Sequence, residues 1–130
     1  MKQEFKIISS LIEKNSKILD VGCGNGELMK YILDNISNNI RGLEISKKNV
    51  QACIEKGLTV IEGNAELDLG QFPNKSFNYV VLSQTLQAFL NPEKVLRELL
   101  RVGKKVSYIT KGNLNFKNLS AELGIFEIEK

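Results

Sequence analysis

The residues of this chain best suited to bind a ligand form a glycine-rich loop near its beginning. An apolar run ends in Asp20, glycines follow at alternate positions (Gly22, Gly24 and Gly26), and a helical pattern begins at Glu27. Because glycine has no Cβ, its backbone adopts positive φ angles and lets a ligand approach closely. The first N–H groups of a helix also point toward such a loop. The pattern therefore predicts a site for a small polar molecule at the carboxyl edge of a parallel sheet.

The spacing of these glycines distinguishes between ligands. A dinucleotide-binding loop has the pattern G-x-G-x-x-G, and Glu27 occupies the position of its third glycine. Asp20 and Glu27 would also repel a pyrophosphate, because all of these groups are negatively charged. The same acids are compatible with a cationic ligand such as S-adenosylmethionine, which carries an amino group and a sulfonium group. A nucleotide-binding enzyme of the dehydrogenase kind is therefore the least favoured alternative.

Residues at the ends of later predicted strands extend this candidate site. Glu44 ends the second strand, where its carboxylate would accept hydrogen bonds from ribose hydroxyls, and the neighbouring Ile45 would pack on a purine ring. Asn64 follows the third strand and offers an amide for the adenine edge. The carboxyl ends of parallel strands converge on one crevice. The candidate cofactor-binding residues are Asp20, Gly22, Cys23, Gly24, Gly26, Glu44, Ile45, Asn64, Ala65, Ser83 and Gln84.

Alternating strands and helices must position these residues. Apolar periodicity predicts helices over 1–14, 27–36, 47–56 and 92–102, and strands over 17–21, 40–45, 58–61, 77–82 and 105–110. Ser46 and Asn91 are suited to be helix N-caps, and Gly57 suits a helix end. Beyond Thr110 we expect a helix over 114–123 and a short strand over 125–128. This alternation predicts a parallel sheet in a single α/β domain, 1–130.

Composition excludes several other functions. The sequence contains no histidine, which rules out His-based triads and His metal ligands and removes the commonest general base. No other residue stands out as a catalytic group, and two cysteines make neither a disulfide framework nor a zinc set. No apolar stretch approaches the roughly 20 residues that span a bilayer, and the charged N-terminus lacks a signal peptide. We expect a cytoplasmic protein without a metal that binds neither membranes nor nucleic acid, since its net charge of +3 is dispersed.

Several of the candidate residues also suit purely structural roles. Cys23 is typical of a small packing residue between loop glycines, and Glu27 complements the positive end of a helix dipole. Asn64, Ser83 and Gln84 fit ordinary turn and cap positions about as well as ligand contacts. The site interpretation therefore depends mainly on the glycine spacing together with Asp20 and Glu44.

The motif Leu-Asp-Val-Gly-Cys-Gly-Asn-Gly at 19–26, followed by Glu44, resembles the class I S-adenosylmethionine-dependent methyltransferases. More narrowly, the chain resembles the methionine biosynthesis protein MetW family. The segments that carry this resemblance are 57–64, 72–77, 79–87 and 95–105. The run Leu-Ser-Gln-Thr-Leu-Gln at 82–87 is more specific than the glycine loop, which many methyltransferases share.

The resemblance implies a three-layer, Rossmann-like class I methyltransferase fold with a mostly parallel sheet. It also implies a protein that binds S-adenosylmethionine or S-adenosylhomocysteine and supports homoserine O-acyltransferase in methionine biosynthesis. The alternative is a free-standing S-adenosylmethionine-dependent methyltransferase of a small molecule, because methyl transfer needs mainly oriented reactants.

Two departures from the family pattern affect these expectations. The segment 107–112 differs from the Ile-Val-Ser-Phe-Pro-Asn type that the family usually has at and after the fifth strand. A fold of this class also continues well beyond that strand, whereas only a short segment follows Thr110. We therefore expect a sheet truncated after the fifth strand, with an edge that needs a partner or a substitute cover.

Overall fold

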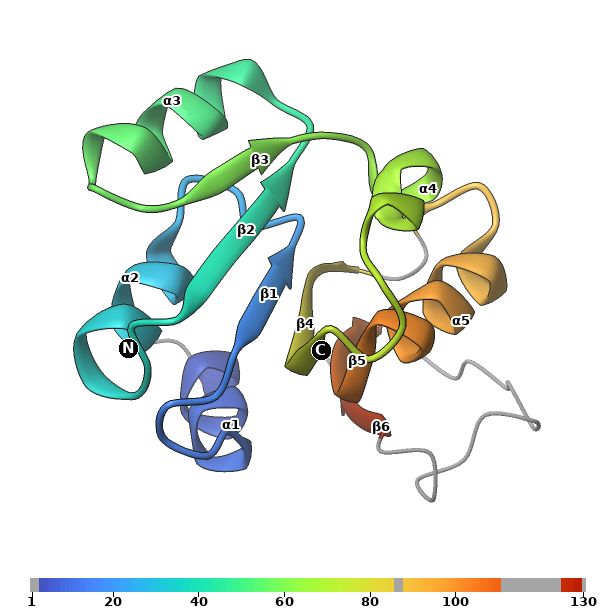
Figure 1. The fold of residues 1–130 in the computed structure, drawn as a ribbon, viewed down its shortest axis with the longest axis horizontal. Coiled ribbons are helices and arrows are strands. Elements are labelled where there is room, and N and C mark those ends of the chain that lie inside the picture. The colour runs from blue at the N-terminus through green and yellow to red at the C-terminus, as the bar shows by residue number, and fades with distance from the viewer. Residues whose placement is uncertain (1–2, 86–87, 111–124, 130) are drawn as a thin grey trace.

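A parallel sheet forms the centre of the protein (Figure 1). The computed structural model describes residues 3–85, 88–110 and 125–129. Within these residues six strands pair in the order β3-β2-β1-β4-β5-β6, and every neighbouring pair is parallel. The strands are β1 (Ile18–Val21), β2 (Ile40–Glu44), β3 (Val60–Glu62), β4 (Phe77–Thr85), β5 (Gly103–Thr110) and β6 (Ile125–Glu129).

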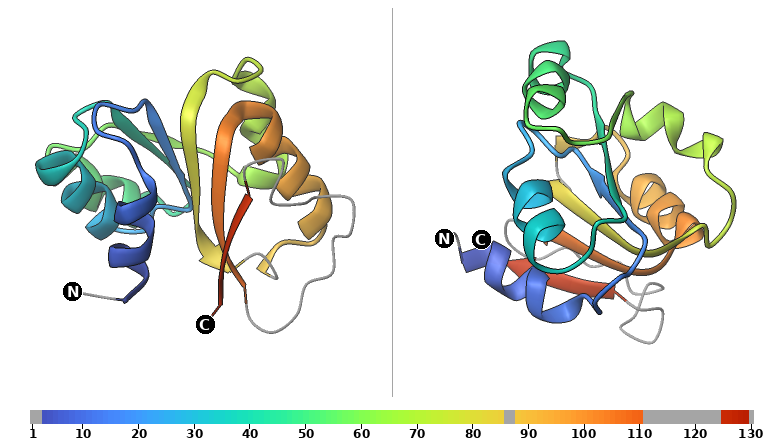
Figure 2. Two further views of the ribbon diagram at one scale, coloured as in Figure 1. Left: turned by 90° about the horizontal axis from the view of Figure 1, so that it is seen from below. Right: turned by 60° about the vertical axis from the view of Figure 1, so that its left-hand side comes forward.

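Helices cover both faces of the sheet, which makes three layers. The left view of Figure 2 shows α1, α2 and α3 on one side of the strands, and α4 and α5 on the other. The helices are α1 (Gln3–Leu11), α2 (Glu27–Asn35), α3 (Lys47–Glu55), α4 (Ala65–Asp68) and α5 (Pro92–Val102), and a 3-10 turn, η1 (Leu69–Gln71), follows α4. The α/β class and the Rossmann-like architecture predicted from the sequence are therefore confirmed.

Two apolar cores hold the helices on the sheet. On one face Leu96 and Leu99 of α5 belong to a cluster with Val80 of β4. On the other face Met29 and Ile32 of α2 belong to a cluster with Val81, the next residue of β4. This alternation along β4 is the period of a strand that is buried on both faces. Burial of each such side chain contributes roughly 1.5–3 kcal/mol, so packing rather than helix propensity fixes the helices.

Side-chain caps begin the helices where the sequence predicts them. The Ser46 hydroxyl accepts a hydrogen bond of 3.3 Å from the Asn49 N–H at the start of α3. The Asn91 side chain accepts one of 3.2 Å from the Lys94 N–H at the start of α5. Both caps satisfy N–H groups that have no partner within their helix. Gly57, after α3, has a φ of 78°, as expected for a glycine at a helix end.

The strand order places a crevice beside β1. The chain passes from β1 to β2 and β3 in one direction across the sheet, and β4, β5 and β6 continue in the other. β1 consequently has β2 on one side and β4 on the other, in parallel register. In open α/β sheets ligands bind outside the carboxyl ends of the strands at such a point of reversal.

The structure also extends the prediction in two places. A strand follows the expected fifth one, because β6 pairs with β5 from Val106 and Ile125 to Thr110 and Glu129. This edge strand corresponds to the one expected over 125–128, and it gives β5 a neighbour on its outer side. The short helix α4 was not expected, and the helix expected over 114–123 lies outside the described residues.

Candidate functional site

A pocket lies over the carboxyl ends of the strands. Its lining includes the residue that directly follows each of three strands: Gly22 after β1, Ile45 after β2 and Gly63 after β3. Phe89, which lies between β4 and α5, also lines it. The complete lining within the described residues is Gly22, Leu43, Ile45, Gly63, Asn64, Ala65, Glu66 and Phe89, and the pocket volume is about 160 Å³.

The glycine loop beside this pocket is held by hydrogen bonds to its own N–H groups. Gly22, Gly24 and Gly26 have φ angles of 71°, 58° and 90°, which favour glycine. The Gly22 N–H donates to the Leu43 carbonyl at 2.7 Å, and the Gly26 N–H donates to the Cys23 carbonyl at 3.1 Å. The Gly24 N–H donates to Glu44 Oε1 at 2.9 Å. These three donors therefore serve the loop itself and do not form a cradle for phosphate.

Two of the loop glycines have different steric reasons to lack a side chain. A Cβ on Gly24 would meet no atom within 4 Å, so this position borders open space. A Cβ on Gly26 would lie 2.4 Å from Leu58 Cδ1 and 3.1 Å from Cys53 Sγ. Gly26 thus allows the loop to pack against the end of α3 and the segment that precedes β3, whereas Gly24 leaves room for a ligand.

The side chain of Cys23 points into the protein and not into the pocket. A Cβ on Gly42 would lie 2.6 Å from Cys23 Sγ, so this thiol packs directly over β2. Cys53 Sγ approaches the same loop and donates to the Gly24 carbonyl at 3.3 Å. Burial raises the pKa of both thiols, which disfavours the reactive thiolate form. Only the backbone of Cys23 is therefore placed to contact a ligand.

The carboxylate of Glu44 joins the glycine loop to the beginning of α3. Its Oε1 accepts the hydrogen bond from Gly24, and its Oε2 accepts one of 2.8 Å from the Ser46 N–H. Glu44 is buried, with 7% of its surface exposed. A carboxylate has about four acceptor sites, so each oxygen keeps capacity for one further donor. Glu44 is thus placed to shape the loop and to accept a hydrogen bond from a ligand.

Asp20 is a buried acid beneath the loop. Its side chain is 0% exposed, and Oδ1 accepts a hydrogen bond from the Ser83 hydroxyl of β4. In the part of the chain that the structure describes, Oδ2 has no hydrogen-bond partner, which is unusual for a buried polar atom. Burial raises the pKa of Asp20 to about 7; the Ser83 hydrogen bond opposes this increase and the nearby charge of Glu44 adds to it.

The remaining predicted residues lie at or near the pocket. Ile45 and Ala65 line it, and Ile45 is 60% exposed. Asn64 also lines it, and its Oδ1 caps α4 by accepting a hydrogen bond of 2.8 Å from the Glu66 N–H. The side chain of Gln84 lies outside the described residues, although its backbone belongs to β4.

Sequence reasoning missed the other half of the lining. Leu43 and Gly63 belong to or follow strands that were predicted, but they carry no polar signal. Glu66 was not selected, although its carboxylate accepts hydrogen bonds from the Leu90 N–H at 2.8 Å and the Asn91 N–H at 3.3 Å. These bonds hold α4 against the segment that carries Phe89.

The chemical character of the site follows from these residues. Apolar side chains and glycines make up most of the lining, Glu66 is its acid, and no Lys or Arg is among the described lining residues. Two further acids, Asp20 and Glu44, are buried beside it. In the described part of the chain no three His, Cys, Asp or Glu side chains gather to hold a metal ion. None of the described helices is long and apolar enough to cross a membrane. The arrangement suits a ligand with an apolar ring and a positively charged group.

Comparison with protein families and with known sequences gives an independent view of the chain. The family model described as "Methionine biosynthesis protein MetW" matches residues 2–126. The bifunctional methionine biosynthesis protein MetXA/MetW of Rhodopirellula baltica is 35% identical over 105 residues. That match covers 75% of this chain but only 17% of the relative. The chain thus spans a small part of that longer protein.

Solved structures resemble the fold. The [4+2]-cyclase SpnF superposes with a TM-score of 0.68 at 24% identity, over 79% of this chain and 41% of that one. A methyltransferase from Thermotoga maritima, a possible histamine N-methyltransferase, gives a TM-score of 0.63 at 24% identity, over 78% and 45% of the two chains. Similarity at this level supports the fold alone, since one fold hosts many activities.

The burial of Asp20 predicts a pH-dependent stability. Because its pKa in the folded protein is about 7, above the ordinary value of 3.8, the folded state binds the proton more tightly than the unfolded state. The contribution of the protonated Asp20 to the free energy of unfolding is therefore complete at low pH and is lost as pH rises toward 7. Between pH 5 and pH 7.5 the free energy of unfolding of wild type should therefore fall by about 2 kcal/mol more than that of Asp20→Asn.

Urea unfolding at the two pH values measures this difference. Asp34→Asn, which removes an exposed acid from α2, is the matched control and should follow the wild-type pH profile. Parallel profiles for Asp20→Asn and wild type would contradict the burial of a titrating Asp20.

Proposed function

The chain belongs to the methionine biosynthesis protein MetW family, and on this premise we propose that it binds S-adenosylmethionine or S-adenosylhomocysteine and supports a homoserine O-acyltransferase. The crevice beside β1 is the proposed binding site. When bound there, S-adenosylmethionine would supply a methyl group activated by its positively charged sulfonium. The residues of the chain would bind and orient this molecule.

The observation that carries the proposal is that the glycine loop offers acids, and not free N–H donors, to a ligand. Its N–H groups at Gly22, Gly24 and Gly26 are used within the protein, whereas two buried acids, Asp20 and Glu44, lie beneath and beside it. A phosphate-binding loop needs the reverse arrangement, with free N–H donors and no adjacent acid. The site therefore favours a cationic ligand over a dinucleotide.

The pocket fits one part of such a ligand. Its volume of about 160 Å³ lies below the roughly 300 Å³ at which whole-ligand pockets begin. Ile45 and Phe89 would provide apolar surfaces for the adenine ring, and Asn64 keeps amide donors for the adenine edge because only its oxygen caps α4. Glu44 would accept hydrogen bonds from the ribose hydroxyls. The amino acid portion would then extend over Gly24, where the structure leaves open space.

The proposed partner comes from the fused relative. The Rhodopirellula protein is named as both MetXA and MetW, and this chain corresponds to only 17% of it. Joining two proteins in one chain raises their effective concentration for each other, which is advantageous when they act together. We infer that the present chain binds a separate homoserine O-acyltransferase.

A free-standing methyltransferase of small molecules is the second candidate. The fold, which the chain shares with the Thermotoga methyltransferase, allows this activity. Methyl transfer requires mainly a nucleophile held in line with the sulfonium, so it does not need a histidine. The two candidates differ in whether S-adenosylmethionine is consumed.

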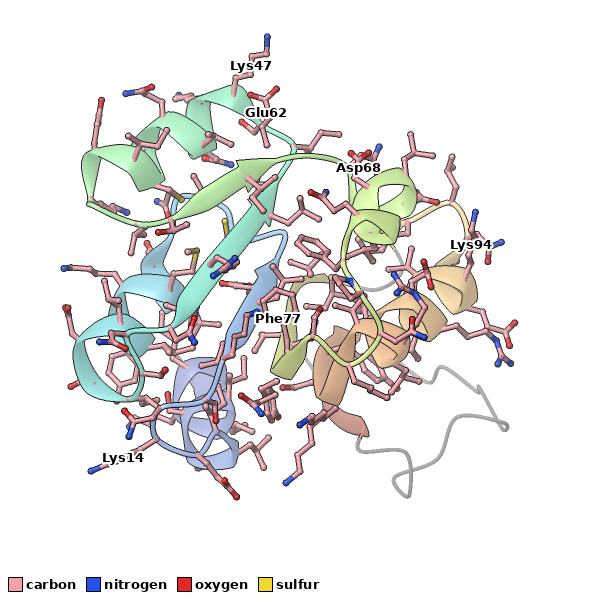
Figure 3. All side chains as sticks on the ribbon, viewed as in Figure 1. Lys14, Lys47, Glu62, Asp68, Phe77 and Lys94 are labelled. Carbon is pink, nitrogen blue, oxygen red and sulfur yellow. The ribbon has the colours of Figure 1, made fainter. Side chains whose placement is uncertain are left out.

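Glu44 provides the first test of the proposed site. Glu44→Gln removes the charge and turns an amide N–H toward one of the two backbone donors, so the affinity for S-adenosylmethionine should fall about tenfold or more. Titration calorimetry measures this change. Glu62→Gln is the matched control, because Glu62 is the register partner of Glu44 on β3 and Figure 3 shows it directed away from β1 and β4. Equal affinity in both variants would exclude Glu44 as a contact.

Gly24 provides a second, steric test. Gly24→Ala places a methyl group in the open space of the loop, so we expect a loss of affinity of about tenfold or more. Gly57→Ala is the control, because Gly57 also has a positive φ, 78°, and a Cβ added there would likewise meet no atom within 4 Å. Both variants should lose about 1 kcal/mol of stability from backbone strain. Calorimetry that shows equal ligand affinity for both would place the ligand elsewhere.

The partner is tested by mixing the purified chain with homoserine O-acyltransferase from the same organism. We expect the two proteins to elute together in gel filtration and the acyltransferase rate to change. Separate elution with an unchanged rate would refute the association. Release of S-adenosylhomocysteine by the chain alone, with a small-molecule acceptor present, would favour the second candidate.

A further inference from the structure

The buried Asp20 and the partly buried Ser83 form a polar pair at the point where the strand order reverses. Asp20 lies on β1 and Ser83 on β4, and the Ser83 hydroxyl donates to Asp20 Oδ1. The second oxygen, Oδ2, has no hydrogen-bond partner among the described residues, although the side chain is 0% exposed. A buried acceptor left without a donor costs free energy. This carboxyl therefore has unused capacity to interact with positive charge.

The other titratable groups around Asp20 do not supply that charge. Glu44 of β2 is negative and disfavours ionisation of Asp20. Cys23 of the loop and Cys53 of α3 interact with Asp20 as thiols whose own ionisation is disfavoured. Lys56 is the nearby cation on the α3 side, and its Nζ donates to the Asn25 carbonyl at 2.7 Å. Within the described residues Asp20 thus forms no ion pair.

We propose that Asp20 makes this site discriminate by ligand charge in a pH-dependent manner, binding S-adenosylmethionine in preference to S-adenosylhomocysteine when its carboxyl is ionised and losing that preference when it is protonated. The inference rests on the proposed function of the crevice. It assigns to Asp20 a preference between the two ligands, which the proposed binding of either ligand does not by itself require.

The reason is electrostatic. S-adenosylmethionine has a net positive charge because of its sulfonium, whereas S-adenosylhomocysteine carries a neutral thioether and has no net charge. A buried carboxylate acts through a medium of low effective dielectric, where charges interact more strongly than in water. An ionised Asp20 therefore stabilises the charged ligand more than the neutral one, and a protonated Asp20 treats both alike.

The direction of the pH dependence follows from linkage. The carboxyl of the free protein titrates with a pKa of about 7. A ligand that binds the ionised form more tightly lowers this pKa, so its binding releases a proton below pH 7. The affinity for S-adenosylmethionine should rise with pH in this range, and the affinity for S-adenosylhomocysteine should change less.

Titration calorimetry with both ligands tests the proposal between about pH 5.5 and pH 7.0, where α-amino groups, with a pKa of about 7.7–8.0, remain mostly protonated. In wild type the ratio of the two affinities should shift toward S-adenosylmethionine by about tenfold across this interval, which lies within the limit for one linked proton. Glu62→Gln, which removes an exposed acid from the edge strand β3, should show the same shift as wild type.

Two variants separate this role from a structural one. Asp20→Asn should give a ratio that no longer depends on pH. Ser83→Ala removes the hydrogen bond that opposes the rise in the Asp20 pKa, so the midpoint of the shift should move to higher pH. A variant that merely damaged the pocket would weaken both ligands without moving this midpoint.

The outcomes are distinct. A pH-dependent ratio that disappears in Asp20→Asn and moves upward in Ser83→Ala supports the proposal. A constant ratio in wild type, or an unchanged pH dependence in Asp20→Asn, overturns it while the proposed binding function stands. Failure of wild type to bind either ligand overturns the binding function and this inference with it.

Discussion

The parallel pairing of β1 with both β2 and β4 is the constraint on which the site depends. Because the chain leaves β1 in one direction across the sheet and continues from β4 in the other, the residues that follow these strands meet over one opening. The same pairing buries Asp20, whose register neighbours are Gly42 on β2 and Val81 on β4. Short turns then suffice to place Gly22 and Ile45 in the pocket. The position of the site thus follows from the order of the strands, and its chemistry follows from the acids near the strand ends and from the turns after them.

Two buried acids have different roles at this opening. Glu44 uses both oxygens to hold the backbone at Gly24 and Ser46, so it maintains the shape that a ligand meets. Asp20 accepts a hydrogen bond from the Ser83 hydroxyl, and its other oxygen has no partner within residues 3–85, 88–110 and 125–129. Burial disfavours the charged form of Asp20. We propose that a cationic ligand restores this form, so that the site combines a loop held by hydrogen bonds with an acid that responds to the charge of the ligand.

The sequence predicts this fold well because its signals are local. Periodicity locates the main helices and the first five strands, and the caps Ser46 and Asn91 begin their helices as expected. The contributions it misses depend on distant contacts. The packing reason for Gly26 lies at Leu58, and Phe89 reaches the pocket because the carboxylate of Glu66 holds the neighbouring backbone. The helix α4 has four residues, too few for a periodic pattern.

A crystal structure of the protein with S-adenosylmethionine tests the central claim most directly, because it locates the ligand and every contact at once. We predict that the adenine ring lies between Ile45 and Phe89, the ribose hydroxyls bond to Glu44, and the sulfonium lies on the side of Asp20. Ligand density outside this crevice, or a ligand carboxylate bound to the loop N–H groups after Glu44 releases Gly24, would contradict the account.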